Sequence, residues 1–218
     1  MKADLKWLRE EWETLLAQFG VDGALVAAVF LDLVARYGED GRYYHNLCHI
    51  QNLLETVATL REQAQNYEAI QLAVWFHDAI YKMQLGADEP SNEERSAHYA
   101  GEILTKMQLP ADIVALVQQL IRATQITPTP PDDVDFHILL DADLAILAAV
   151  PEVYDQYARA IRQEYAFVPE EGYRNGRVLI LQSFLDRDRI YCTAIMYQHY
   201  EQAARQNIER EIAALQAG

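Results

Sequence analysis

Residues 67–81 read YEAIQLAVWFHDAIY, and this run is apolar on nearly every side of a helix. A helix that is apolar all round belongs in the centre of a protein rather than on its surface. We therefore predict a central helix over residues 67–81. His77 and Asp78 interrupt it, and ionisable groups are costly to bury unless they are paired or bind a metal.

Helical spacing of apolar residues recurs on both sides of this run. Leu5, Leu8, Trp12 and Leu15 form one stripe, which predicts a helix that ends at Gly20. Alternating patterns typical of strands are scarce, so the predicted fold class is all-α. The other predicted helices cover residues 22–37, 46–63, 91–109, 110–124, 135–150, 151–168, 172–187 and 193–218.

The chain is long enough for one sizeable core, and no flexible linker divides its 218 residues. We predict a single domain over residues 1–218, in which the helices of residues 1–38 and 193–218 pack on the rest. The domain is expected to be a bundle of about nine or ten helices. The longest break, QITPTPPDDV at residues 125–134, is predicted to be a loop within this domain. The sequence leaves the oligomeric state open.

Charge and composition limit the possible partners. The formal net charge is -15, whereas proteins that bind nucleic-acid polymers draw much of their affinity from Lys and Arg at phosphates. No apolar run reaches the length of a membrane-spanning helix, and the N-terminus has no apolar signal core. Cys48 and Cys192 have no CxxC spacing and make no disulfide framework. We therefore expect a cytoplasmic protein that binds neither nucleic-acid polymers nor membranes and acts on a small molecule.

Two pairs of polar residues interrupt apolar segments of the chain. His77 and Asp78 adjoin in the run described above, and Asp141 and Asp143 lie within HILLDADLAILAAV. Each pair has a structural interpretation when taken alone, because a buried His-Asp pair can be hydrogen-bonded and an aspartate can lie on a helix surface. Together with the preceding histidine at position 49, however, the order H…HD…D indicates a shared metal ion.

This order and five motifs resemble the HD-domain superfamily of metal-dependent phosphohydrolases. The motifs are RYYHNLCHI (42–50), WFHDAIY (75–81), NEERSA (92–97), DADLAIL (141–147) and IRQEY (161–165). They are most similar to a bacterial branch of predicted phosphohydrolases whose substrate is not settled. The resemblance implies an all-α domain of the HD type, in which two histidines and two aspartates hold a divalent metal.

The resemblance assigns the metal ligands to His49, His77, Asp78 and Asp143, and it places Asp78 in the catalytic centre. Asp143 matches the last site of the superfamily better than Asp141 does, so Asp141 is expected to orient a ligand from the second layer. The expected cofactor is a divalent metal, as one ion or two, and the candidates are Mn, Fe, Co, Ni, Mg and Zn. A mixture of imidazoles and carboxylates favours the first five over a closed structural zinc site.

The piece YHNLCH (44–49) also resembles the YHNxxH motif of cyclic nucleotide phosphodiesterases. Carried over by position, His45 is the general acid and His49 is a metal ligand. Histidines four apart on a helix can share a face, but a zinc protease is not expected, because Asn46 replaces the glutamate of its HExxH motif. We place Asn46 in the second layer. After the HD pair this chain has AIY (79–81) in place of histidine, proline and glycine, which argues against a cyclic nucleotide substrate.

Other residues are predicted to bind the substrate: Arg42, Tyr81, Asn92, Glu93, Glu94, Arg162, Tyr165 and Arg177. Arginine is the usual clamp for phosphate oxygens, although each arginine could equally form a surface salt bridge. Glu93 and Glu94 have an alternative interpretation as part of a capped helix start, because Ser91 lies three residues before Glu94, the spacing of a capping box. Tyrosines at helical spacing commonly pack in a core, and Glu164 could line the pocket.

These residues predict a phosphomonoesterase or phosphodiesterase for a small phosphorylated metabolite, and the resemblance favours nucleotides. In such enzymes a metal activates water for attack on phosphorus. Two alternatives stay open. One is a non-catalytic regulatory module that keeps the metal site, and the other is a di-iron HD oxygenase, which would need His98 or His137 as an additional ligand.

Overall fold

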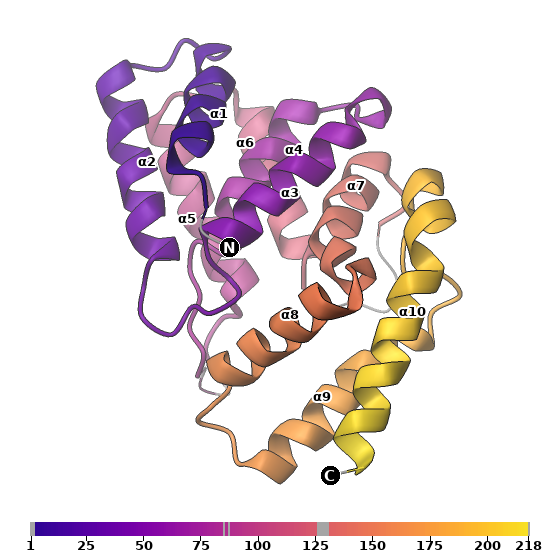
Figure 1. Ribbon diagram of the computed structural model, residues 1–218. Coiled ribbons are helices and arrows are strands. Elements are labelled where there is room, and N and C mark those ends of the chain that lie inside the picture. The colour runs from indigo at the N-terminus through magenta and orange to yellow at the C-terminus, as the bar shows by residue number, and fades with distance from the viewer. Residues whose placement is uncertain (1–2, 85, 87, 126–130, 218) are drawn as a thin grey trace.

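The computed structural model describes residues 3–84, 86, 88–125 and 131–217. Within these residues it contains ten α-helices, two 3-10 helices and no strand, which confirms the predicted all-α class (Figure 1). The predicted loop at 125–134 includes residues 126–130, which lie outside the described residues. The helices are α1 (Leu5–Ala17), α2 (Gly23–Tyr37), α3 (Leu47–Thr59), η1 (Arg61–Gln63), α4 (Tyr67–Phe76), α5 (Asn92–Lys106), α6 (Ala111–Ala123), α7 (Val134–Asp143), η2 (Leu144–Ala148), α8 (Pro151–Glu164), α9 (Glu170–Leu185) and α10 (Ala194–Ala217).

Helix α4 lies at the centre of the N-terminal part of the fold, as its composition predicted. Every residue from Ala69 to Phe76 is buried, and the helix contacts α3, α5, α6 and α7. Trp75 meets Trp12 of α1 edge to face, with ring centroids 5.3 Å apart. The Trp12 indole N–H also donates to the Val26 carbonyl of α2 at 3.0 Å. These contacts fix the first two helices on α4.

The helix predicted over residues 67–81 ends at Phe76 rather than at Tyr81. The chain turns after Phe76 because side chains, and not a further helical turn, satisfy the backbone groups that follow. The Ser96 hydroxyl of α5 accepts from the N–H of Ile80 at 3.1 Å and donates to its carbonyl at 3.2 Å. His77 and Asp78 consequently stand at a helix end and not within a helix.

Arg42 holds this turn from the other side. Its buried guanidinium donates to the carbonyl oxygens of His45 at 3.2 Å, Asp78 at 2.7 Å and Ala79 at 3.2 Å. One arginine thus joins the segment that precedes α3 to the segment that follows α4. The two stretches that carry the four candidate histidine and aspartate residues of the N-terminal half are tied together at their backbones.

Helix α3 begins at Leu47, and Asn46 is its N-cap. The Asn46 side-chain oxygen accepts from the N–H of Cys48 at 2.9 Å, so this residue has a structural role. His45 precedes the cap and lies outside the helix, whereas His49 lies in its first turn. The idea that the two histidines share one helical face was therefore wrong.

The C-terminal helices extend the same core. The buried apolar side chains form one cluster that reaches from Leu8 of α1 to Ile212 of α10. Helix α10 packs along α9 and against η2, and Figure 1 shows α9 and α10 side by side near the C-terminus. Among the described residues, no helix combines the length and the apolar character needed to cross a membrane.

Candidate metal centre

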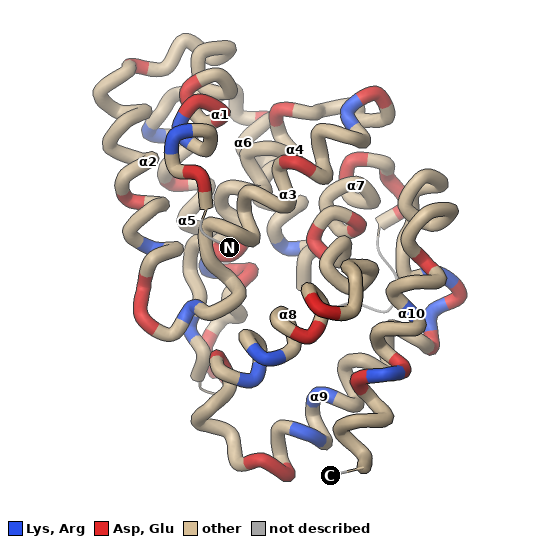
Figure 2. Tube along the Cα trace, viewed as in Figure 1, with Lys and Arg blue, Asp and Glu red and all other residues tan. Residues whose placement is uncertain are grey.

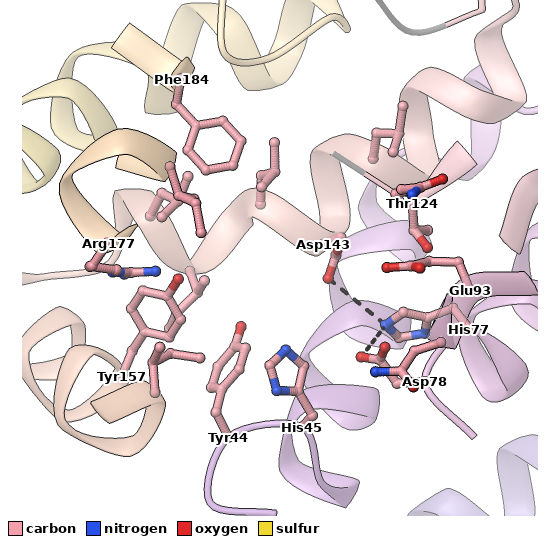
Figure 3. Close-up of a pocket in the computed structure, with 18 of the residues that line it drawn as sticks. Tyr44, His45, His77, Asp78, Glu93, Thr124, Asp143, Tyr157, Arg177 and Phe184 are labelled. Atoms are coloured by element: carbon pink, nitrogen blue, oxygen red, sulfur yellow. Dashed lines mark ion pairs between the residues drawn. The ribbon is translucent and has the colours of Figure 1, made fainter. Parts of the chain in front are cut away.

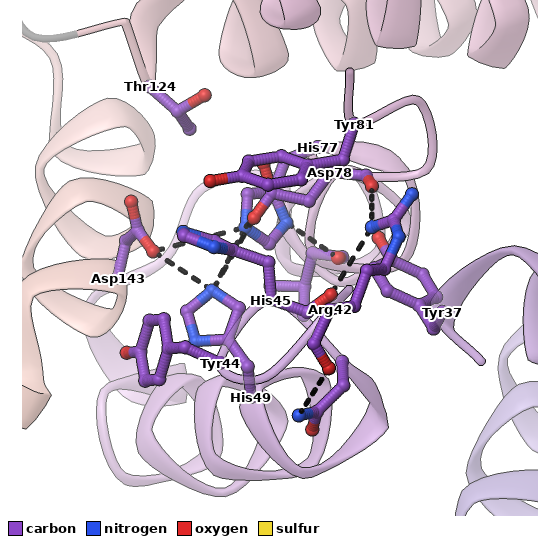
Figure 4. Close-up of polar contacts among 12 residues, drawn as sticks. Tyr37, Arg42, Tyr44, His45, His49, His77, Asp78, Tyr81, Thr124 and Asp143 are labelled. Atoms are coloured by element: carbon purple, nitrogen blue, oxygen red, sulfur yellow. Dashed lines mark hydrogen bonds and ion pairs between the residues drawn. The ribbon is translucent and has the colours of Figure 1, made fainter. Parts of the chain in front are cut away.

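The four side chains predicted as metal ligands converge from the ends of three helices (Figure 4). His49 is in the first turn of α3, His77 and Asp78 follow α4, and Asp143 is the last residue of α7. The Nε2 atoms of the two histidines are 3.2 Å apart. Asp78 Oδ2 lies 3.0 Å from His77 Nε2 and 3.7 Å from His49 Nε2. Asp143 Oδ1 lies 3.2 Å from His49 Nε2 and 3.9 Å from His77 Nε2.

The hydrogen bond on the far side of the His77 ring sets its tautomer. His77 Nδ1 is 2.9 Å from the carbonyl oxygen of Val74. Because a carbonyl only accepts, Nδ1 carries the hydrogen, and the neutral ring has its lone pair on Nε2. That lone pair faces the other three side chains of the cluster. Histidine ligands in metal sites commonly donate their second N–H in this way.

The spacing of these atoms suits one ion held between them. Ligand atoms about 2.0–2.2 Å from a metal lie roughly 3.0–3.5 Å apart when they occupy neighbouring coordination positions. Among the described residues, His49, His77 and Asp78 form a group whose ligand atoms all lie within 4.8 Å of one another. Asp143 approaches both histidines from α7. Two imidazoles and two carboxylates are a donor set that fits a divalent metal with positions left for water or substrate.

The electrostatics of the cluster favour a positive charge at its centre. Burial alone would lower the pKa of His77, but the neighbouring charge of Asp78 raises it to about 9. Burial would raise the pKa of Asp78, yet the charge of His77 holds it well below its ordinary value. Burial dominates at His49, whose pKa is lowered. A proton supplies the positive charge in the metal-free protein, so metal binding is expected to release a proton.

Glu164, the last residue of α8, holds the segment that carries His45. Its Oε1 accepts from the backbone N–H groups of Tyr44 at 2.7 Å and His45 at 2.9 Å. Its Oε2 lies 2.6 Å from His45 Nδ1. Tyr81 stacks on the His45 ring with centroids 4.4 Å apart. Both the backbone and the ring of His45 are therefore fixed, and Nε2 lies on the ring edge away from Glu164.

The same bond changes the acidity of both partners. Burial would lower the pKa of His45, but the hydrogen bond to Glu164 and the charge of Asp78 raise it above its ordinary value. Burial would raise the pKa of Glu164, whereas the hydrogen bond from His45 lowers it. The pair thus favours an imidazolium beside a carboxylate. From the motif IRQEY, Glu164 was predicted only to line the pocket. Its bond to His45 could not be predicted, because the two residues are 119 positions apart in the sequence.

The cluster opens into a cavity of about 460 Å³, a size found in small-molecule sites. Figure 3 shows its two ends. His77, Asp78 and Asp143 lie at one end, which we call the metal end, and Arg177 and Phe184 lie at the other. The structure places five of the residues predicted for the substrate on the wall of this cavity, namely Tyr81, Asn92, Glu93, Tyr165 and Arg177.

The other three residues predicted for the substrate do not line the cavity. Arg42 is bound to the backbone carbonyls described above. Glu94 forms an ion pair with Arg122 at 2.6 Å. Arg162 pairs with Glu170 at 3.0 Å and donates to the Tyr165 carbonyl at 2.7 Å. Each of these side chains is already engaged in contacts within the protein. We therefore do not assign substrate contact to any of the three.

Three more candidates lie outside the cluster. The buried Asp141 carboxylate accepts from the N–H groups of Cys192 and Thr193, both at 2.7 Å, so it anchors the segment before α10. The structure thus brings Asp143 and not Asp141 to the histidines. The His98 side chain is 74% exposed and faces Glu102, and His137 does not line the cavity. Neither histidine belongs to the group of His49, His77 and Asp78 that the described residues offer to a metal.

Comparison of the chain with protein-family models, with curated proteins and with solved structures found no match. The geometry of the cluster and the motifs that resemble the HD superfamily are therefore the grounds on which a function is proposed. They define a buried cluster of two histidines and two aspartates that could hold a metal ion at one end of a cavity of small-molecule size.

Proposed function

We propose that the protein is a metal-dependent phosphohydrolase that acts on a small phosphorylated metabolite, with nucleotides as the favoured class. The observation that carries the proposal is the convergence of two imidazoles and two carboxylates at the metal end of the cavity. A divalent ion in such a set supplies Lewis-acid activation of water and of a phosphoryl oxygen. We expect the activity in the cytoplasm, since the two cysteines lack the pattern of a secreted disulfide framework.

His45 is the residue placed to protonate the leaving oxygen. It lines the cavity beside Asp78, and its Nδ1 is engaged by Glu164, which leaves Nε2 for the substrate. A histidine with a pKa near the working pH is suited to general acid catalysis. Glu164 acts through His45 and is a positioning residue in this scheme. Asp78 and Asp143 would hold the ion together with His49 and His77.

Metal analysis followed by phosphate-release assays tests the proposal. The purified chain is analysed for bound metals, stripped with a chelator and reloaded with Mn or Mg. Phosphate release is then measured with nucleotides and sugar phosphates. We expect about one ion per chain and release that depends on it. A fully loaded protein that hydrolyses none of these esters would contradict a phosphohydrolase and favour a regulatory module, and two bound irons with oxygen consumption would favour the oxygenase.

The variant Glu164→Gln is expected to lower kcat by about 10- to 100-fold, the range typical of residues that orient groups at a metal site. An amide has one acceptor oxygen, so it does not accept all three N–H bonds that Tyr44 and His45 now give to the carboxylate. The pKa of His45 falls when the carboxylate is removed. Since a general acid works in its protonated form, the alkaline limb of the kcat/KM profile should move to lower pH.

Glu94→Gln is the matched control, because Glu94 pairs with Arg122 outside the cavity. It should change neither kcat nor the pH profile. Bound metal is expected to be unchanged in both variants. A Glu164→Gln protein with a wild-type pH profile would show that Glu164 does not position the acid.

A further inference from the structure

The two ends of the cavity differ in chemical character. Carboxylates and imidazoles line the metal end, as described above. The opposite end is formed by α8 and α9, where Ile161 lies one turn from Tyr157 and where Ile180 and Phe184 lie one turn apart. We call this the apolar end. In Figure 3 Tyr157 and Phe184 lie on one side of Tyr44, His45 and Asp143, and His77 and Asp78 lie on the other side.

Aromatic rings connect the two ends along one wall. Tyr44 packs against the metal-binding His49 with centroids 4.7 Å apart, and it packs against Tyr157 of α8 at the same distance. Tyr157 in turn lies under the Arg177 guanidinium at 5.2 Å. Burial raises the pKa of both tyrosines, so the wall is uncharged at neutral pH. Such a wall suits a planar or apolar group better than a second charged one.

Two glycines of α9 leave room on the α9 side of the same cavity. Gly172 and Gly176 are one helical turn apart, and both line the cavity. A Cβ atom at Gly176 would meet no atom within 4 Å, and one at Gly172 would meet only Val168 Cγ1 at 3.5 Å. Neither glycine has a positive φ, so the backbone does not require glycine there. Their effect is to keep space in the cavity.

The charged side chains on the cavity wall favour binding of a single phosphate group over binding of two or three. Three carboxylates, those of Asp78, Glu93 and Asp143, line the cavity and outweigh the two positive charges of a divalent ion. Figure 2 shows arginines on α8 and α9, but of these only Arg177 lines the cavity. Its guanidinium is neutralised by Glu211, with bonds of 2.8 and 3.1 Å.

Arg187 is the other arginine on the described part of the wall. It lies over the Phe184 ring at 4.8 Å, at the apolar end and away from the metal. The His45 imidazolium lies at the metal end, but it is paired with Glu164. A second or third phosphate next to the first would therefore meet the acidic metal end without an unpaired cationic partner, at a high desolvation cost.

We infer that the substrate is a monophosphate ester whose alcohol part is an apolar or aromatic group, held between the Tyr44–Tyr157 wall and the glycines of α9. The inference rests on the proposed function, because the metal fixes the phosphate at one end. It narrows the nucleotide class to monophosphates, in which the base would occupy the apolar end. Polyphosphates and esters of small polar alcohols are expected to be poor ligands.

Binding of phosphonates, which are not hydrolysed, tests the inference independently of turnover. Naphthylmethylphosphonate and methylphosphonate are titrated calorimetrically into the Mn-loaded full chain. We expect the naphthyl compound to bind at least about tenfold more tightly, because its ring removes apolar surface from water. The same comparison of non-hydrolysable phosphonate analogues of AMP and ATP should favour the AMP analogue. Equal affinities in either pair would overturn the inference.

The variant Gly176→Leu tests where the ring lies. The added side chain fills the space beside the aromatic wall, and it should reduce naphthylmethylphosphonate binding by about tenfold while methylphosphonate changes less than about twofold. Folding should not suffer, since leucine has a higher helix propensity than glycine. The control is Asn175→Leu, which places the same side chain at an exposed position of α9 outside the cavity.

The outcomes separate this inference from the proposed function. Phosphate release from many esters without any preference for an apolar alcohol part would overturn the inference and leave the phosphohydrolase intact. A preference for the naphthyl compound that Gly176→Leu abolishes would support the inference even if no ester were hydrolysed. If Gly176→Leu, folded by circular dichroism, kept the wild-type preference, the assignment of the apolar end would be overturned.

Discussion

The variant Asp78→Ala is expected to lose bound metal and phosphate release together. Asp78 Oδ2 lies 3.0 Å from His77 Nε2 and 3.7 Å from His49 Nε2, so its removal takes away one ligand atom and one negative charge. Replacing an outer-layer partner of a metal ligand typically costs about 10- to 100-fold in metal affinity, and losing a ligand itself should cost more. Metal content per chain after dialysis, and the metal concentration needed for half-maximal phosphate release, measure the effect.

The loss should not come from unfolding. Arg42 binds the backbone carbonyl of Asp78 at 2.7 Å, and alanine keeps that carbonyl. The metal-free variant is therefore expected to keep the helical circular-dichroism spectrum of the wild type at the assay temperature, while its thermal midpoint falls because the buried His77 imidazolium loses its partner. Asp155→Ala is the control, because Asp155 forms a surface ion pair with Arg210 and should leave metal content unchanged. Full metal occupancy in Asp78→Ala would remove Asp78 from the ligand set.

The sequence predicted which residues form the metal-ligand cluster better than it predicted the backbone structure that positions them. The order H…HD…D is visible along the chain because each element carries its own polar interruption in an apolar run. The end of α4 was not predictable in that way. The turn after Phe76 depends on Arg42, which lies 36 residues before Asp78, and on Ser96 of α5. Apolar periodicity says nothing about such side-chain bonds.

The support of His45 illustrates the same limit. A histidine four residues before a metal ligand suggests a shared helical face, but the Asn46 cap starts the helix one residue too late for that. What fixes His45 is Glu164, at the end of α8. The cavity is likewise a product of tertiary packing, since its aromatic wall joins Tyr44 to Tyr157 of α8. Whether a segment forms a helix depends mainly on its local sequence. The contacts of His45 with Glu164 and of Tyr44 with Tyr157 arise only when helices distant in the sequence pack together.

The variant His45→Ala is expected to keep its metal and to lower kcat by about 10²- to 10⁴-fold, the contribution typical of a general acid. The side chain is bound to Glu164 through Nδ1 and stacked on Tyr81, and the four candidate ligands are complete without it. Metal content should therefore equal that of the wild type. The alkaline limb that a protonated His45 gives to the kcat/KM profile should disappear.

The choice of leaving group separates acid catalysis from a general disturbance of the site. An ester of a simple alcohol needs a proton on the departing oxygen, whereas 4-nitrophenyl phosphate releases a stable phenolate without one. His45→Ala should therefore slow the alkyl ester far more than the nitrophenyl ester, and His98→Ala, at an exposed position on α5, should slow neither. Equal slowing of both esters would argue against proton donation. Loss of metal from His45→Ala would instead indicate that His45 is a metal ligand. The assignment of His45 as the general acid and His49 as the ligand would then be wrong.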